Sequence, residues 1–323
     1  MANTLPINIS AWNHRHILDV QDLSPAEIEL VMETTKVMQE RLLRNSKKSS
    51  ELSGKTVVTL FYEASTRTRG SFEIAAKNLG ADVVNITVQT SSVAKGESLI
   101  NTIKTLESIG ADFLVMRHPL SGAHISVAPF MRAGLINAGD GWHAHPTQAL
   151  LDLFTMLQHL KSMEGRRIVI VGDIKHSRVA HSNIWCLSKM GAKVVLCAPP
   201  TLLPAGLGQA SSHFPSVEVQ HDIRTAIADA DVIMELRLQK ERMKGDLLPG
   251  VEEFTRSYQL NTARLALAKP QAIVMHPGPV NEDIELEAKL LHNSRVVVNE
   301  QVANGVAVRM ALLQLLAWRE EYA

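Results

Sequence analysis

Residues 56–87 read TVVTLFYEASTRTRGSFEIAAKNLGADVVNIT, and this stretch decides the fold class. The apolar runs at residues 56–61 and 82–87 predict two buried strands, and residues 65–79 predict a helix that Gly80 ends. Apolar residues are continuous in both strands rather than alternating, which is typical of parallel strands covered on both faces. The stretch is therefore predicted to be a β–α–β unit.

The alternation of strands and helices continues along the chain. It predicts a helix at 98–109, ended by Gly110, and a strand at 113–116. After a polar break at 161–167 the pattern restarts, with strands at 168–171, 193–197, 232–235 and 272–275, a helix at 181–190 and a long amphipathic helix at 301–319. We therefore expect an α/β protein with two doubly wound parallel-sheet domains, hinged near a helix at 146–160.

The composition excludes several classes of protein. The 33 basic and 33 acidic residues cancel, whereas a general nucleic-acid binder needs a basic excess. Apolar residues make up 46% of the 323, enough for a large core. The longest uncharged stretch, 194–217, contains four prolines, so no membrane span is expected. The two cysteines, Cys186 and Cys197, are expected to be buried and inert, and we expect a soluble cytoplasmic protein.

Ligands of open α/β sheets bind beyond the carboxyl ends of the strands, so the loops there are of interest. In the first such loop, the hydroxyls of Ser65, Thr66 and Thr68 and the guanidinium of Arg67 stand at a predicted helix N-terminus, which favours a phosphate. An ordinary Ser/Thr cap with exposed arginines is the alternative. Two apparent nucleotide motifs fail, because residues 54–56 (GKT) lack the preceding P-loop glycine and Gly172 lacks the glycines of a dinucleotide fingerprint.

A second group of polar residues surrounds the predicted helix at 146–160. Pro146 suits a first helical position, so His145 lies beside the helix start, where a neutral ring can donate a hydrogen bond to an oxyanion. Gln148 is predicted to face the same side, and Arg117 follows a strand end. His143 and His145 also resemble a metal-binding pair, but no third ligand is evident, and a core histidine is the alternative for either.

The second half offers cations in two further loops. Arg178 follows a strand and enters a helix, and Arg237 and Gln239 follow another strand. Together they can hold a small dianion with two carboxylates. For the charged residues 240–242, a solvated surface run is the strong alternative. The turn at 276–279 (HPGP) is rigid, and its backbone carbonyls can line a site.

Seven ordered blocks between Thr56 and Met310 resemble the aspartate/ornithine carbamoyltransferase family: FYEASTRTRGSFEIAAKNLGA, SVAKGES, VMRHP, GDGWHAHPTQALLD, GDIKHSRVAHS, RLQKERM and MHPGPV. Residues 276–279 and 237–242 are similar to the aspartate branch rather than the ornithine branch. The resemblance implies transfer of a carbamoyl group from carbamoyl phosphate to L-aspartate, in pyrimidine biosynthesis and without cofactor or metal. It also implies an active site in a cleft between domains 1–150 and 151–300, with helix 301–323 returning to the first domain.

The resemblance also implies a role for each matching residue. For carbamoyl phosphate it implies contacts from Ser65, Thr66, Arg67, Thr68, Arg117, His145 and Gln148, of which Arg67, Thr68, Arg117 and His145 are catalytic. For aspartate it implies contacts from Arg178, Arg237, Gln239, Gly278 and Pro279. Ser91 and Lys95 match residues that reach in from the neighbouring subunit of a homotrimer, Ser91 to carbamoyl phosphate and Lys95 to both substrates. Glu63 matches a residue that pairs across the domain gap with Arg178 and Arg242.

Several questions stay open at this stage. Gly278 stands where many relatives have leucine, and residues 244–258 match no subgroup. A different amine acceptor is the nearest alternative function, and a non-catalytic partner in a pathway complex is a second one. The presence of Arg67, Arg117 and His145 disfavours the second. Association with a regulatory chain or a dihydroorotase is open, and neither nucleic acid nor membrane is an expected partner.

Overall fold

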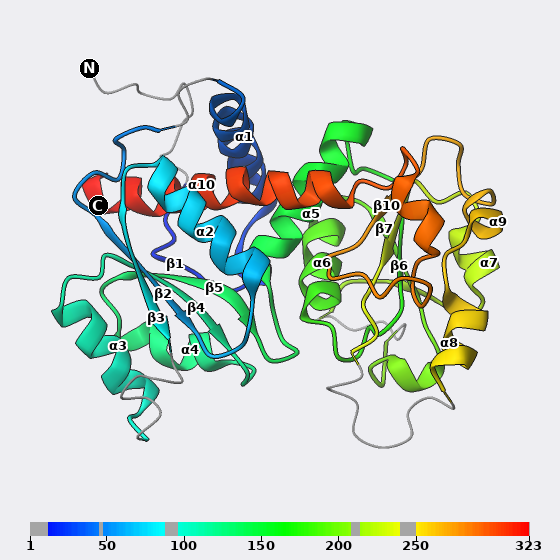
Figure 1. The fold of residues 1–323 in the computed structure, drawn as a ribbon, viewed down its shortest axis with the longest axis horizontal. Coiled ribbons are helices and arrows are strands. Elements are labelled where there is room, and N and C mark those ends of the chain that lie inside the picture. Colours follow the sequence, from blue (N-terminus) through cyan, green and yellow to red (C-terminus); the bar gives the residue numbers. More distant parts are fainter. Residues whose placement is uncertain (1–11, 45–47, 88–95, 208–213, 240–249, 323) are drawn as a thin grey trace. The chain divides into compact units, whose positions relative to one another are not determined.

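The structure, a computed structural model, describes residues 12–44, 48–87, 96–207, 214–239 and 250–322 (Figure 1). The chain divides into two compact units. Unit 1 comprises residues 1–154 and 302–323, and unit 2 comprises residues 155–301. Each unit contains a five-stranded sheet in which every neighbouring pair of strands is parallel, which confirms the predicted α/β class.

The sheet of unit 1 has the strand order β1-β5-β4-β2-β3. Its strands are β1 (His16–Ile17), β2 (Thr56–Phe61), β3 (Asp82–Thr87), β4 (Phe113–His118) and β5 (Gly134–Asp140). From β2 the chain builds outward through β3 on one side and through β4 and β5 on the other. The carboxyl ends of β2 and β4 therefore flank the point where the strand order reverses, which is where open α/β sheets bind ligands.

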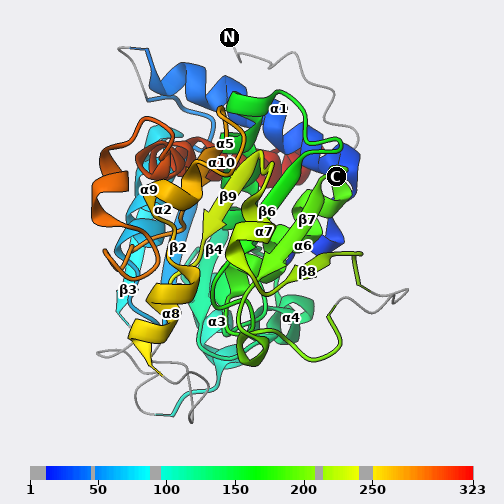
Figure 2. The same cartoon turned by 90° about the vertical axis from the view of Figure 1, so that its right-hand side faces the viewer.

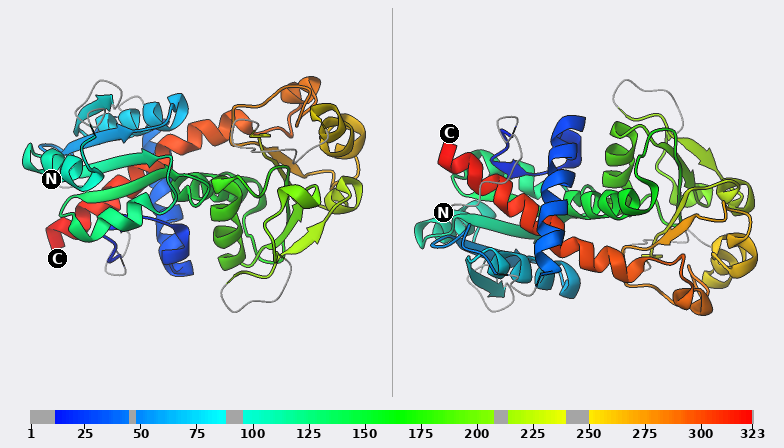
Figure 3. Two further views of the ribbon diagram at one scale, coloured as in Figure 1. Left: turned by 90° about the horizontal axis from the view of Figure 1, so that it is seen from below. Right: turned by 90° about the horizontal axis from the view of Figure 1, so that it is seen from above.

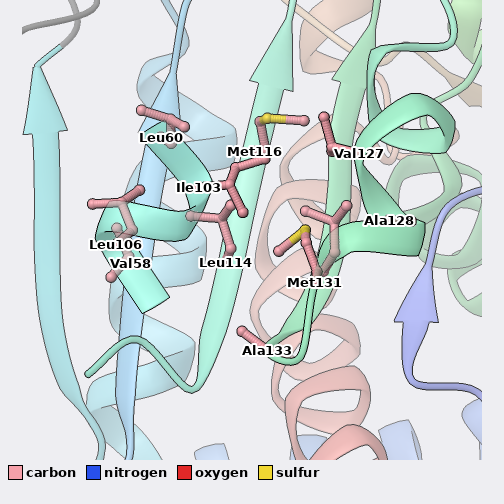
Figure 4. Packing of buried hydrophobic residues seen from close by; sticks show 11 residues of the cluster. Val58, Leu60, Ile103, Leu106, Leu114, Met116, Val127, Ala128, Met131 and Ala133 are labelled. Atoms are coloured by element: carbon pink, nitrogen blue, oxygen red, sulfur yellow. The ribbon is translucent and has the colours of Figure 1, made fainter. Parts of the chain in front are cut away.

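Helices cover both faces of this sheet. They are α1 (Pro25–Leu42), α2 (Thr66–Asn78), α3 (Leu99–Ser108), α4 (Ala123–Val127), α5 (Pro146–Leu160), which continues into unit 2, and the returning α10 (Val298–Tyr322). Figure 4 shows the face under α3 and α4, where Val58 and Leu60 of β2 belong to one buried cluster with Ile103 of α3 and Val127 of α4. Burial on both faces explains why the apolar runs of β2 and β4 are continuous.

The opposite face lies under α1, α2 and α10. Figure 3 shows α1 (blue) crossing α10 (red), and the side-chain amide of Gln39 on α1 donates to Asn304 on α10 at 2.8 Å. The guanidinium of Arg309 on α10 lies 5.1 Å from the ring centre of Phe72 on α2. The C-terminal helix therefore packs on unit 1, as predicted.

Unit 2 has the strand order β10-β9-β6-β7-β8 (Figure 2). Its strands are β6 (Arg167–Val171), β7 (Lys193–Cys197), β8 (Glu218–Gln220), β9 (Val232–Glu235) and β10 (Ile273–Met275). Its helices are α6 (Arg178–Lys189), α7 (Ile223–Ile227), α8 (Val251–Tyr258) and α9 (Thr262–Leu265). The strand order reverses between β6 and β9, so the loops that follow these two strands flank the second candidate binding edge.

Most predicted elements are confirmed within a few residues. The differences are mainly at ends: α6 begins at Arg178 rather than His181, and β4 continues to His118. Several elements had no prediction, among them α1 and β5. Short 3-10 turns lie at Val20–Asp22, Ala128–Phe130, Pro200–Leu202 and Ala288–His292. Both cysteines are buried and reduced, and burial raises the pKa of the Cys197 thiol to about 12. Among the described residues, no helix combines the length and apolarity that crossing a bilayer requires.

Candidate functional site

Strand register brings three loops of unit 1 to one sheet edge, two of which were predicted, those after β2 and β4. Phe61 at the end of β2 pairs with Arg117 of β4, and His118 of β4 pairs with Asp140 at the end of β5. The loops that follow β2, β4 and β5 therefore leave the sheet side by side. The hydroxyl-rich residues 63–69 follow β2, Arg117 lies next to the last residue of β4, and the segment that leads to His145 follows β5.

The hydroxyl-rich loop does not have the ordinary capped arrangement. Ser65 occupies the N-cap position of α2, but its side chain makes no capping hydrogen bond. Instead its hydroxyl accepts a long hydrogen bond, 3.4 Å, from Arg117, whose Nε also donates to Glu63 at 3.1 Å. Thr66 and Arg67 are exposed, while Thr68 is buried in the first turn. The alternative of an ordinary side-chain cap at Ser65 is therefore wrong. The uncapped N-terminus of α2, beside an arginine, suits an anion.

Asp140 fixes the loops that follow β4 and β5. Its carboxylate is fully buried and accepts hydrogen bonds from the backbone N–H of Gly122 at 2.7 Å, that of Ala144 at 3.1 Å, and the side-chain amide of Asn137 at 2.9 Å. Burial acts to raise the pKa of Asp140, but the hydrogen bonds, that from His143 foremost, lower it overall. One ionised side chain thus holds the backbone of the loop that follows β4 and that of the loop that follows β5.

The histidines of this segment have different environments. His143 lies with Nδ1 3.1 Å from Asp140 and Nε2 3.5 Å from Asp19, and the hydrogen bond to Asp140 raises its pKa. His145 is buried directly before α5, and its carbonyl accepts from the N–H of Gln148 at 3.0 Å. Among the described residues no three His, Cys, Asp or Glu side chains are grouped so that they could hold a metal ion.

Gln148 lies one turn from His145 on α5. Its side-chain NH2 donates to Asp152 at 2.9 Å, so the amide oxygen of Gln148 faces away from that carboxylate. Unit 1 therefore places Ser65 and His145 directly before helices and Gln148 in the first turn of α5, at the carboxyl edge of its sheet. Arg117 lies at that edge within the last residues of β4, rather than after the strand as predicted.

In unit 2, Val171 of β6 pairs with Glu235 of β9, so the loops that carry Arg178 and Arg237 also leave a common edge. Arg178 is the first residue of α6 and is buried, and the preceding Ser177 caps the helix. The carboxylate of Asp173 connects the two loops, because it accepts from the ring of His176 at 2.8 Å and from the backbone N–H of Gln239.

A second buried carboxylate, Glu285, connects the Arg237 loop to the turn after β10. It accepts from the N–H of Leu238 at 2.7 Å and from the N–H of Asn281 at 2.9 Å. In that turn, Gly278 has a φ of +67°, a left-handed conformation that favours glycine. Arg237, Gln239, Gly278 and Pro279 therefore lie in segments that are tied to one another through backbone amides.

Some of the predicted site residues are not placed. Ser91, Lys95 and Arg242 lie outside the described residues. Glu63 is engaged with Arg117 of its own unit, and its pairing with Arg178 and Arg242 stays a prediction. The sequence interpretation missed the supporting carboxylates, which are Asp140, Asp152, Asp173 and Glu285. Asp140 and Asp173 each follow a glycine at a strand end, and this position is the signal that could have found them.

Fold and site define a two-unit parallel α/β protein that presents hydroxyl, guanidinium and imidazole groups at the carboxyl edge of one sheet and guanidinium groups at that of the other. Residues 15–158 match the description "Aspartate/ornithine carbamoyltransferase, carbamoyl-P binding domain", and residues 164–316 match "Aspartate/ornithine carbamoyltransferase, Asp/Orn binding domain". The chain belongs to the aspartate/ornithine carbamoyltransferase family.

Similar proteins share nearly the full length of the chain. The aspartate carbamoyltransferase catalytic subunit of Dehalococcoides mccartyi (strain CBDB1) is 59% identical, over 98% of this chain and 96% of its own. That of Roseiflexus sp. (strain RS-1) is 53% identical, over 94% and 95%. Among solved structures, Trypanosoma cruzi aspartate transcarbamoylase in complex with carbamoyl phosphate and aspartate has a TM-score of 0.87 and 34% identity, over 96% of this chain and 98% of that one.

Proposed function

We propose that this chain is an enzyme that transfers the carbamoyl group of carbamoyl phosphate to the amino group of L-aspartate, giving N-carbamoyl-L-aspartate and phosphate for pyrimidine biosynthesis. The observation that carries the proposal is the uncapped start of α2, with the Ser65 hydroxyl directed to Arg117 at the reversal point of the first sheet. The similarity to the Dehalococcoides subunit over 98% of the chain supports it.

Carbamoyl phosphate binds, in this proposal, at the edge of unit 1. The N–H groups and hydroxyls at the start of α2, Ser65, Thr66 and Thr68, bind the phosphate together with Arg67 and Arg117. His145 and Arg117 donate hydrogen bonds to the carbonyl oxygen, and Gln148 accepts one from the carbamoyl nitrogen.

L-Aspartate binds at the edge of unit 2. Arg178 and Arg237 each pair with a carboxylate, Gln239 adds a hydrogen bond, and Gly278 and Pro279 contribute backbone groups. Two guanidinium groups match a substrate with two carboxylates, whereas ornithine brings a cationic side chain. This chemistry favours aspartate over the alternative acceptor.

The reaction needs a neutral amine. Its lone pair forms a C–N bond to the carbamoyl carbon, and the carbonyl becomes an oxyanion. Arg117, His145 and Thr68 stabilise that oxyanion, each well-placed donor contributing about 3 kcal/mol. The C–O bond to phosphate then breaks, and the leaving phosphate takes the proton of the amine. Holding two mutually repelling anions together supplies much of the remaining acceleration.

The same proposal includes a cytoplasmic homotrimer with shared active sites, to which a neighbouring subunit contributes Ser91 and Lys95. Mixing two variants with lowered activity, Lys95→Gln and His145→Ala, tests it. Activity of the mixture that rises above that of either variant after subunit exchange supports shared sites. An exchanged mixture that is no more active than the two variants refutes them.

The decisive experiment is a spectroscopic assay of carbamoyl-aspartate formation, with ornithine and other amino acids as alternative acceptors. Of the acceptors tested with carbamoyl phosphate, we expect only aspartate to be turned over. Turnover of another amine but not of aspartate contradicts the proposal. His145→Ala should lower turnover without abolishing it, because the phosphate accepts the proton. A folded His145→Ala enzyme that binds carbamoyl phosphate and is completely inactive would contradict this mechanism.

A further inference from the structure

The side-chain amide of Gln148 can present either of two ends to a ligand. Its NH2 donates hydrogen bonds and its oxygen accepts them, so the direction of the group decides which ligand it recognises. The NH2 of Gln148 donates to Asp152 at 2.9 Å, and its oxygen accepts no hydrogen bond from the described residues. An ionised carboxylate only accepts, so an ionised Asp152 forces this direction.

Asp152 is fully buried on α5, one turn beyond Gln148. A buried carboxylate favours its protonated form unless a cation is near. The carboxylate of Asp152 acts to raise the pKa of Arg309 on α10, a guanidinium that is only 3% exposed, so the two charges attract each other within unit 1. Burial nevertheless lowers the pKa of Arg309 only to about 10, so the guanidinium stays charged at neutral pH.

The place of this guanidinium is fixed by the packing of α10 on α5. Its Nη1 donates to the carbonyl of Gly305 at 2.9 Å. A Cβ added at Gly305 would lie 2.4 Å from Nη1 of Arg309 and 3.2 Å from Leu151 of α5. The absence of a side chain at Gly305 therefore leaves the space in which Arg309 lies.

We propose that Asp152 is a positioning residue: it accepts the NH2 of Gln148 and so turns the oxygen of Gln148 toward the donor substrate, and the site then recognises the NH2 of a carbamoyl group. The inference rests on the proposed function. It predicts discrimination between carbamoyl phosphate and acetyl phosphate, in which a methyl group replaces that NH2 and offers no hydrogen bond.

Asp152→Asn tests the inference. Arg309 attracts the single oxygen of the new amide, so its NH2 faces Gln148 and reverses the Gln148 amide. The NH2 of Gln148 then faces the NH2 of bound carbamoyl phosphate, and the two donors cannot form a hydrogen bond. Calorimetric binding to the full-length protein should show carbamoyl phosphate weakened about 10- to 100-fold. Acetyl phosphate should bind within about twofold of its wild-type affinity, because it makes no hydrogen bond there.

Two further variants serve as controls. In a Gln148→Ala background, Asp152→Asn should no longer change the ratio of the two affinities, since the amide that it reverses is absent. Gly305→Ala displaces the guanidinium of Arg309 without altering a residue of the donor site. It should therefore lower the affinity for carbamoyl phosphate relative to that for acetyl phosphate, as Asp152→Asn does. This variant also tests the idea if Asp152→Asn fails to fold.

If folded Asp152→Asn binds both ligands equally more weakly, Asp152 has a purely structural role and the inference is overturned. Unchanged affinities for both ligands would overturn it as well. Failure of the proposed function has a different signature. In that case the wild-type protein itself binds no carbamoyl phosphate and forms no carbamoyl-aspartate.

Discussion

Replacing Asp140 by Asn should disturb the two loops that flank the proposed donor site. Oδ2 of the buried carboxylate accepts from Gly122, and Oδ1 accepts from Asn137 and Ala144. An asparagine keeps one oxygen. With that oxygen in the Oδ1 position it retains two of these hydrogen bonds, but its NH2 then opposes the N–H of Gly122.

One buried N–H group is thus left without an acceptor, which costs about 1–3 kcal/mol. The free energy of unfolding is therefore expected to fall by about 2 kcal/mol. The loops also lose their common anchor, so the KM for carbamoyl phosphate should rise more than the KM for aspartate.

The destabilisation should depend on pH. The folded-state pKa of Asp140 is lowered, so its contribution is present above its ordinary value of 3.8 and is lost as the pH falls through the folded value. The pKa of His143 is raised, so its contribution is present below its ordinary value of 6.5 and is lost as the pH rises through the folded value. The difference in stability should be largest between about pH 4 and 6.5 and should shrink at higher pH.

Urea unfolding of the wild-type and Asp140→Asn proteins between pH 4 and 9 measures this difference. His143→Gln is the matched control, because it removes the titrating ring and leaves the backbone hydrogen bonds of Asp140 in place. It should flatten the upper part of the pH profile. A loss below about 0.5 kcal/mol, which is typical of surface substitutions, would refute the assigned role of Asp140. So would a loss that stays constant across the pH range.

Three other substitutions test separate parts of the structure. Ser65→Ala should weaken carbamoyl phosphate about tenfold and leave the urea midpoint unchanged, since the hydroxyl makes no capping bond; a fall in the midpoint would restore the capping role. Arg237→Ala should raise the KM for aspartate about 10- to 100-fold at unchanged affinity for carbamoyl phosphate, and kinetics with both substrates varied would expose an equal effect on each. Phe72→Ala should lower the free energy of unfolding by about 3–5 kcal/mol in urea titrations, because the ring is fully buried beneath Arg309; a loss under about 1 kcal/mol would contradict that packing.

Sequence patterns predicted the strands that are buried on both faces of the sheet and are mostly apolar. Strands β2 and β7 are buried from their second residue to their last and are mostly apolar, and their bounds were predicted to the residue. Strand β5 was missed because its sequence, GLINAGD, contains two glycines, an asparagine and an aspartate, which single-sequence rules assign to turns. In the structure Asn137 donates to the carbonyl of Leu18 and to Asp140, so polar residues occupy a buried strand through specific long-range hydrogen bonds.

The candidate site was predicted in the same uneven way. Arg117 lies at the end of a strand, His145 directly before a helix and Arg178 at the first residue of a helix, and a single sequence shows such positions. The carboxylates of Asp152 and Glu285 act through partners that only the folded chain brings near, Arg309 in one case and Leu238 in the other. A pattern search along one sequence has no means of pairing residues that are over a hundred positions apart, as Asp152 and Arg309 are.

Helix α10 has a consequence for how the nascent polypeptide matures. Residues 302–323 belong to unit 1, yet the ribosome makes them only after all of unit 2. Until then the α2 side of the first sheet lacks part of its apolar cover, and Arg309 cannot yet neutralise Asp152. Unit 1 therefore completes its core after translation of unit 2, even though its strands emerge first.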